Sequence, residues 1–330
     1  MILLGLLIIA IGAFCQSSSY VPINKVKSWS WESYWIVQGL FAWLVLPLLG
    51  AMLAVPEGRS LFELFSADPK ATFLTIFYGI LWGVGGLTFG LSMRYLGVAL
   101  GQSISLGTCA AMGTILAPVF TGQAASITAS VVIGVVVTLV GIAVIGVAGS
   151  MKARNTGASS VKDFNFGKGI SVALLAGLMS ACFNIGLYQG NEMSFDGVSP
   201  MFATLPATFL VTLGGLLTNA VYCFTQNSRN HTWGDYAKGN VWFNNLVFCI
   251  LAGALWYSQF FGLALGKGYL AGSPTLYTFA FCILMALNVI FSNLWGVILK
   301  EWKGCSGKTV AVLVAGIVIL ILSCFIPQLI

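Results

Sequence analysis

The chain of 330 residues is 58% hydrophobic and only 7% charged, with a formal net charge of +6. A soluble domain needs about 25% charged residues to cover its surface, so this composition excludes an ordinary soluble enzyme or binding domain. The positive charge matches anionic lipid headgroups and does not indicate a nucleic-acid partner.

Ten apolar runs follow one another along the chain, each close to the roughly 20 residues that a helix needs to cross a bilayer. A run such as 127–148 is apolar all round, which predicts helices and excludes the alternating strands of a membrane barrel. The first run could instead be a signal sequence, but no positive residues precede it and Phe14 is bulky where a cleavage site needs a small residue. We therefore expect ten retained helices, with these approximate spans: 1–21, 34–55, 71–91, 98–119, 126–149, 168–189, 200–224, 240–264, 272–299 and 307–327.

Positive residues alternate between the gaps that separate these spans. The odd-numbered gaps hold twelve of the fifteen Lys and Arg residues and the even-numbered gaps hold three. Cytoplasmic loops carry the excess of Lys and Arg, so the odd gaps are predicted to be cytoplasmic. Both termini are then expected outside the cytoplasm.

A polar stretch divides the spans into five plus five. It predicts a first half over 1–150, a cytoplasmic linker over 151–167 and a second half over 168–330. Since each half holds an odd number of spans, duplicated halves would lie inverted in the membrane. Phe89 to Met93 resembles Phe261 to Leu265 at matching positions, which favours duplication. Gly79, Gly83, Gly86 and Gly90 share one face of the third span and predict a close helix crossing there.

Charged groups are nearly absent from the predicted spans. The acidic residues and the single His lie in gaps or at span ends, so a metal centre or a catalytic triad within the membrane has no side chains to form it. The eight Cys residues are scattered without C-x-x-C spacing and are expected to act as small hydrophobic residues. We expect neither an enzyme nor a bound metal or cofactor.

Amides and aromatic rings fill the spans instead, a combination that fits a neutral solute rich in hydroxyl groups. Asn and Gln supply both donors and acceptors for hydroxyls, and Trp and Tyr rings pack against the C–H faces of a sugar. Interhelical hydrogen bonding and interfacial aromatic belts remain the alternative for each single residue. The substrate-binding candidates are Trp256, Tyr257, Gln259, Asn184, Gln38 and Trp82.

Five stretches of the sequence resemble the L-rhamnose–proton symporter family, and they occur in family order along nearly the whole chain. They are Lys25 to Glu32, Leu81 to Gly85, Met93 to Gly97, Trp256 to Phe261 and Leu299 to Trp302. The resemblance implies a ten-helix fold of the drug/metabolite-transporter type. It also implies inward symport of L-rhamnose with H⁺ by alternating access across a bacterial inner membrane, with both termini outside.

Symport of a proton requires a group that binds and releases it near working pH. Glu32, next to the predicted second span, is the candidate; the alternative is a solvated carboxylate that pairs with Lys25 or Lys27. Arg94 is expected to be a cytoplasmic charge anchor or gate. Transport of another sugar or small metabolite on the same fold, and a membrane sugar sensor without transport, stay open, as does the oligomeric state.

Overall fold

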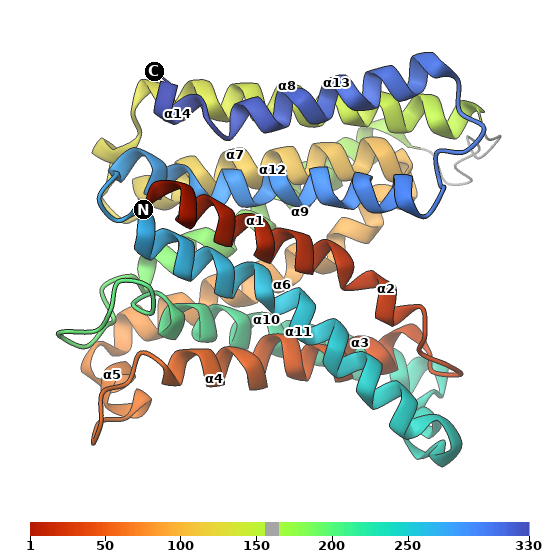
Figure 1. The fold of residues 1–330 in the computed structure, drawn as a ribbon. Helices are drawn as coiled ribbons and strands as arrows, with labels where there is room; N and C mark the ends of the chain where they lie inside the picture. The colour runs from red at the N-terminus through yellow and green to blue at the C-terminus, as the bar shows by residue number, and fades with distance from the viewer. Residues whose placement is uncertain (156–164, 330) are drawn as a thin grey trace. The chain divides into compact units, whose positions relative to one another are not determined.

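The fold is taken from a computed structural model in which residues 1–155 and 165–329 are described. Part of the predicted linker 151–167 therefore lies outside the described residues. The helical segments in chain order are α1 (Ile2–Ser18), α2 (Tyr20–Ile23), α3 (Trp31–Leu40), η1 (Phe41–Val45), α4 (Leu46–Met52), α5 (Leu61–Ala67), α6 (Pro69–Leu96), α7 (Val98–Phe120), η2 (Ala124–Ser126), α8 (Ala129–Asn155), α9 (Phe166–Gln189), α10 (Leu205–Asn230), η3 (Trp233–Ala237), α11 (Gly239–Leu270), α12 (Pro274–Ile298), α13 (Gly307–Ser323) and α14 (Ile326–Leu329) (Figure 1).

The helices confirm an all-helical membrane protein with nine to ten spans. Within the described residues, nine helices are long and apolar enough to cross a bilayer. The tenth predicted span corresponds to α13, an apolar helix of 17 residues followed by the short α14. At about 1.5 Å per residue α13 is roughly 25 Å long, slightly less than the hydrocarbon thickness of about 30 Å.

Helix ends differ from the predicted ones where local chemistry decides them. The second span begins at Trp31, earlier than predicted, so Glu32 lies in the first helical turn of α3. The seventh begins only at Leu205, because Pro206 is well placed in a first helical turn. It continues to Asn230, where His231 takes the left-handed conformation (φ 55°) that ends the helix.

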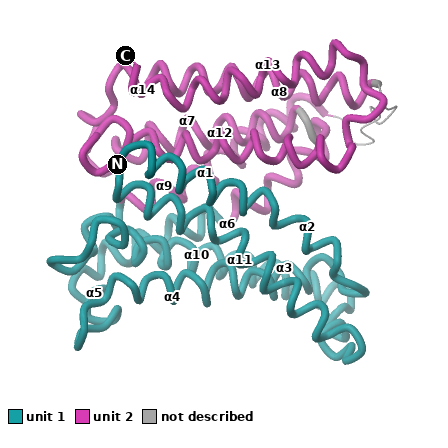
Figure 2. Tube along the Cα trace, viewed as in Figure 1, with its two compact units in different colours: residues 1–83, 189–269 teal, residues 84–188, 270–330 magenta. Residues whose placement is uncertain are grey.

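The described chain forms two compact units, coloured separately in Figure 2. Unit 1 comprises Met1–Gly83 and Gln189–Tyr269, and unit 2 comprises Val84–Tyr188 and Leu270–Ile330. Unit 1 therefore takes one segment from each half of the sequence, whereas the first segment of unit 2 runs from the first half across the predicted linker into the second. The predicted halves, 1–150 and 168–330, describe a duplication in the sequence and not compact units. They stay a prediction.

In unit 1, α10 packs against α3, η1 and α4, and glycines allow two further close helix crossings. A Cβ on Gly79 or Gly83 of α6 would overlap α10, whereas a Cβ on Gly86 or Gly90 would meet nothing within 4 Å. The predicted crossing on this face of α6 is thus present at Gly79 and Gly83, which belong to unit 1. At the second crossing, a Cβ on Gly12 of α1 would lie 2.6 Å from the Ser258 carbonyl oxygen of α11.

In unit 2, α8 packs along α7 and α13, and α12 packs against both α7 and α8 (Figure 1). Phe279 and Phe281 of α12 are fully buried and lie over Gly134 of α8 and Gly113 of α7. Because each large ring packs against a glycine, these helices approach closely. In a membrane, where lipid provides no hydrophobic driving force between helices, such close van der Waals packing holds them together.

Candidate functional site

Four tryptophans from three helical stretches meet in unit 1. The ring of Trp43, in η1, lies 5.7 Å from those of Trp35 and Trp256 and 6.4 Å from that of Trp82, with edge-to-face geometry in each pair. The rings of Trp82 and Trp256 lie 5.8 Å apart, and Phe260 packs on Trp256 at 5.2 Å. We call Trp35, Trp43, Trp82, Trp256 and Phe260 the aromatic cluster.

Glycines form the surfaces on which the side chains of Trp43, Trp82 and Tyr257 rest. A Cβ added to Gly39 would overlap the six-membered ring of Trp43, and one on Gly215 would overlap that of Trp82. A Cβ on Gly50 would overlap the hydroxyl oxygen of Tyr257. Because larger residues at these positions would push the aromatic groups aside, the glycines fix where the groups lie.

The helix that carries Trp43 changes its winding at this point. α3 continues into the π-helical turn η1 and then into α4. A π turn inserts one extra residue, is intrinsically unfavourable, and is frequent at functional sites. Here it rotates the residues after Leu40 relative to α3 and places Trp43 between Trp35 and Trp256.

Two buried polar atoms beside this turn have unused hydrogen-bonding capacity. Trp43 Nε1, a donor, and Gln38 Oε1, an acceptor, have no hydrogen-bond partner among the described residues. Their residues are 2% and 1% exposed. A buried polar group without a partner costs about 1–3 kcal/mol, so this donor and this acceptor, five residues apart in the chain, are candidates for hydrogen bonds to a ligand. In contrast, Trp35 Nε1 donates to Asn219 Oδ1 at 2.9 Å.

The predicted substrate-binding residues divide between the units. Trp82 and Trp256 belong to the aromatic cluster, and Gln38 lies in α3, where its carbonyl oxygen faces Gly253 of α11, one turn before Trp256. Tyr257 is buried on the same helix α11, and its hydroxyl has no partner among the described residues.

The other two amide candidates make bonds that stabilise helices. Gln259 is buried and its Nε2 donates to the Trp256 carbonyl of its own helix at 3.3 Å. Asn184 lies on α9 in unit 2, where its Nδ2 donates to the Gly113 carbonyl of α7 at 2.8 Å and ties these two helices together. The Oδ1 atom of Asn184 has no partner among the described residues, and its role in binding stays a prediction.

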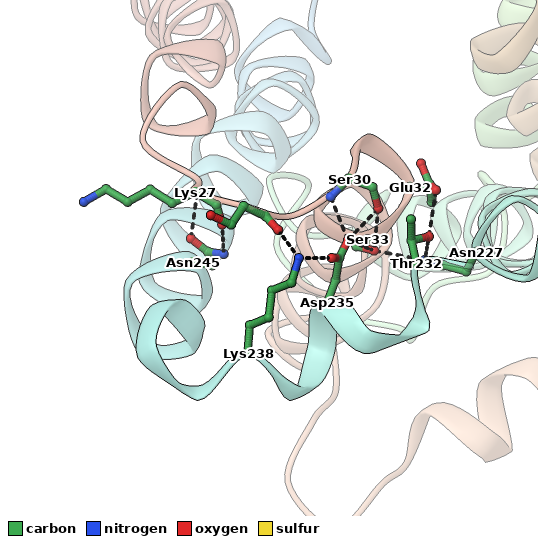
Figure 3. Close-up of polar contacts among 10 residues, drawn as sticks. Lys27, Ser30, Glu32, Ser33, Asn227, Thr232, Asp235, Lys238 and Asn245 are labelled. Atoms are coloured by element: carbon green, nitrogen blue, oxygen red, sulfur yellow. Dashed lines mark hydrogen bonds and ion pairs between the residues drawn. The ribbon is translucent and has the colours of Figure 1, made fainter. Parts of the chain in front are cut away.

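A polar network at the start of α3 joins this helix to the segment between α10 and α11 (Figure 3). Its centre is the buried Asp235, whose Oδ2 accepts from Ser30 N at 2.7 Å, Ser30 Oγ at 2.7 Å and Ser33 Oγ at 2.9 Å. Lys238 Nζ bonds the other oxygen at 2.6 Å. Burial alone would raise the pKa of Asp235, but the hydrogen bonds from Lys238, Ser30 and Ser33 outweigh it and lower the pKa to about 2.

Glu32 lies beside this network but has a different environment. Its Oε1 accepts from Asn230 Nδ2 at 3.0 Å and from Thr232 Oγ1 at 2.8 Å, and the residue is 6% exposed. Neither Lys25 nor Lys27 forms an ion pair with it, so the alternative of a solvated, lysine-paired carboxylate is wrong. Figure 3 shows the amino group of Lys27 extending away from Glu32. Glu32 is thus a buried carboxylate held by neutral donors.

Arg94 lies in the last turn of α6 and is exposed. A cation at a helix C-terminus interacts favourably with the helix dipole, which suits an anchor.

Sequence reasoning missed several residues of the candidate site. Trp35 and Trp43 were only two of several aromatic residues in the sequence, and the unused Nε1 of Trp43 had no sequence signal. Asp235 was simply a residue in a gap, and nothing in the sequence connects it to Ser30 and Ser33, some 200 residues earlier. The Trp29-Ser30-Trp31-Glu32 stretch, which carries part of the family resemblance, was the one available pointer to this end of α3.

Comparisons with known proteins agree along the whole chain. Residues 1–329 match the family described as L-rhamnose-proton symport protein (RhaT). The L-rhamnose-proton symporter of Yersinia pestis (strain Pestoides F) is 33% identical over 98% of this chain and 96% of its own length. The L-rhamnose-proton symporter of Klebsiella pneumoniae is 32% identical over 95% of this chain and 93% of its own. The chain therefore belongs to the L-rhamnose-proton symport family, a family of transporters rather than enzymes.

Proposed function

We propose that this protein imports L-rhamnose, or a closely similar neutral sugar, together with a proton. The full-length family match is the observation that carries this proposal. The chemistry of unit 1 supports it, since the aromatic cluster supplies apolar ring faces and an unused donor at Trp43, and Gln38 of the same unit supplies an unused acceptor.

The sugar would bind with its C–H face against the tryptophan rings. Indole rings combine an apolar face with a polar edge and suit a deoxy sugar, which has one methyl group and several hydroxyls. One hydroxyl would accept from Trp43 Nε1 and another would donate to Gln38 Oε1. An anionic solute would instead require a cation, and none of Trp35, Trp43, Trp82, Trp256 and Phe260 provides one.

Glu32 would carry the proton. Of the two buried carboxylates at this end of unit 1, Asp235 is bonded to Lys238 and has a pKa of about 2, which keeps it charged at any working pH. Glu32 accepts hydrogen bonds from the neutral side chains of Asn230 and Thr232. The charged Glu32 accepts a hydrogen bond from the Thr232 hydroxyl, and a protonated Glu32 can donate one to the same hydroxyl instead. Protonation of Glu32 therefore leaves no lysine without its partner.

Transport would follow alternating access between two inverted five-helix halves. The matching Phe89–Met93 and Phe261–Leu265 stretches and the odd number of spans in each half support the inversion. The distribution of Lys and Arg supports a cytoplasmic position for the start of α3 and for Arg94, with both termini on the periplasmic side of a bacterial inner membrane.

The test is uptake of radiolabelled L-rhamnose into proteoliposomes with and without an inside-alkaline pH gradient. We expect accumulation above equilibrium that collapses when an uncoupler is added. Saturable uptake that ignores the gradient would refute proton coupling and leave a sugar transporter. Binding without uptake would identify a sensor, and uptake of another sugar in place of rhamnose would correct the substrate.

A further inference from the structure

An open groove runs along the packed helices α7 and α8 of unit 2, apart from the aromatic cluster. It has a volume of about 560 Å³. Its α8 wall runs from Leu139 to Arg154 with alternating steps of three and one residues, which is one face of a helix, and its α7 wall runs from Leu100 to Thr108 in the same way. Along α8 the groove is roughly 22 Å long, longer than the roughly 15 Å that one leaflet contributes to the hydrocarbon core.

The chemistry of the groove changes along its length. Ile104, Leu139 and Ile142 form an apolar inner part, and a Cβ on Gly107 would lie 3.2 Å from Leu139 Cδ2, so a glycine at this position keeps the groove from narrowing. Since α7 and α8 are antiparallel neighbours, Ser103 near the start of α7 and Arg154 at the end of α8 lie at the same end of the groove. That end is polar and positively charged.

Arg154 has capacity for an external anion. It is exposed and forms no ion pair with any of the acidic side chains that the structure describes. The neighbouring Lys152 differs, because its Nζ bonds Glu301 at 3.2 Å and lies 4.8 Å from the ring centre of Trp302. A guanidinium group matches phosphate in a bidentate manner.

We propose that this groove binds an anionic phospholipid, with one acyl chain along Leu139 to Val147 and the phosphate at Arg154. The groove opens beside Val140 and Val147, which are 49% and 55% exposed on a helix that spans the membrane, so lipid chains are the molecules in contact with it. The positive end lies on the side that the loop charges assign to the cytoplasm, where anionic lipids supply a negative surface and basic sites between helices bind lipid headgroups. This proposal does not depend on the transported solute.

Native mass spectrometry of the full-length protein in detergent tests the proposal. Phosphatidylglycerol and phosphatidylcholine with the same acyl chains are titrated in competition. We expect one phosphatidylglycerol molecule to bind in preference, and Arg154→Gln to reduce that preference about fivefold, the effect of losing one basic side chain at a membrane surface. The matched control is Arg229→Gln, which removes an exposed arginine from the last turn of α10 in unit 1 and should leave the preference unchanged.

A second variant examines the apolar part. Ala143 lines the groove and is exposed, so Ala143→Trp fills the groove without disturbing buried packing and should reduce binding of both lipids. Equal binding of the two lipids to the unmodified protein, or equal effects of Arg154→Gln and Arg229→Gln, would overturn the proposal. So would lipid binding that survives Ala143→Trp. A dimer that forms on delipidation and is lost in Ala143→Trp would show that a second copy of the chain, not lipid, covers the groove.

Discussion

Replacing Gly39 by Ala tests whether the position of the Trp43 ring matters for sugar binding. A Cβ at this position overlaps the six-membered ring of Trp43. Ordinary contact between carbon atoms requires about 3.5–4.0 Å, so the ring has to move by roughly 1 Å. Trp43 is 2% exposed and its ring is packed among those of Trp35, Trp82 and Trp256, so a movement of the ring also displaces its neighbours.

The size of the effect follows from these contacts. Overpacking a well-packed site costs about 1–3 kcal/mol of stability. A misplaced Nε1 forfeits one hydrogen bond to the sugar, worth about 1 kcal/mol, which raises the half-saturation concentration for L-rhamnose about fivefold. The maximal rate should change less, because Glu32 and its partners are untouched.

The assay is the initial rate of L-rhamnose uptake into proteoliposomes as a function of sugar concentration. Near-UV circular dichroism of the same preparation reports the packing of the tryptophan rings. The matched control is Gly167→Ala in α9, where an added Cβ meets nothing within 4 Å, and both readouts should stay as in the unmodified protein. If Gly39→Ala changes the dichroism but not the half-saturation concentration, the ring moves without consequence and Trp43 does not bind the sugar.

Three further variants separate the proposed roles. Trp43→Phe removes Nε1–H, so sugar affinity should fall about fivefold. Because it also removes one ring of a buried indole, the unfolding temperature should fall as well. Unchanged affinity returns Trp43 to a packing role. Glu32→Gln should abolish accumulation driven by the pH gradient while equilibrating uptake of sugar persists, and full accumulation in this variant excludes Glu32 as the proton carrier. Asp235→Asn should cost about 1.5–3 kcal/mol at neutral pH, because charge-assisted bonds to Ser30 and Lys238 are lost. Since the folded-state pKa of Asp235 is about 2, below the ordinary value of 3.8, its stabilisation is present above about pH 4 and fades as the pH falls towards 2. The difference in unfolding temperature between Asp235→Asn and the unmodified protein should shrink over that range, and a constant difference would contradict the assigned charge.

The sequence predicted the helices well because lipid restricts what can cross it. Backbone groups in hydrocarbon must bond within their own helix, so hydropathy alone identified the spans, including the long run that became α8. Helix ends followed rules that hydropathy does not contain. The extension of α10 to Asn230, for example, depends on a left-handed residue at His231.

The site was less predictable, because its residues are related only by contacts. The sequence predicted tryptophans and amides for a sugar; Trp82 and Trp256 lie together, and sugar binding by these residues stays a prediction. The π turn at Phe41–Val45 leaves no pattern in an apolar run, since every residue there suits a helix. Likewise Gly39 and Gly215 look like any glycines of a membrane helix until the rings that rest on them are known.

One continuous helix links the two parts of the proposed mechanism. Glu32 lies in the first turn of α3, and Trp43 lies eleven residues later in η1, roughly 16 Å along the axis. A shift of this helix on protonation at one end therefore has to move the ring at the other end, which is a physical route for coupling. Coupling between binding sites is reciprocal, so the pH at which protons bind should depend on rhamnose, and rhamnose affinity should depend on pH. In Glu32→Gln the affinity should be independent of pH over the same range. Rhamnose affinity that stays pH-dependent in this variant would place the proton on another group and would remove α3 as the connecting element.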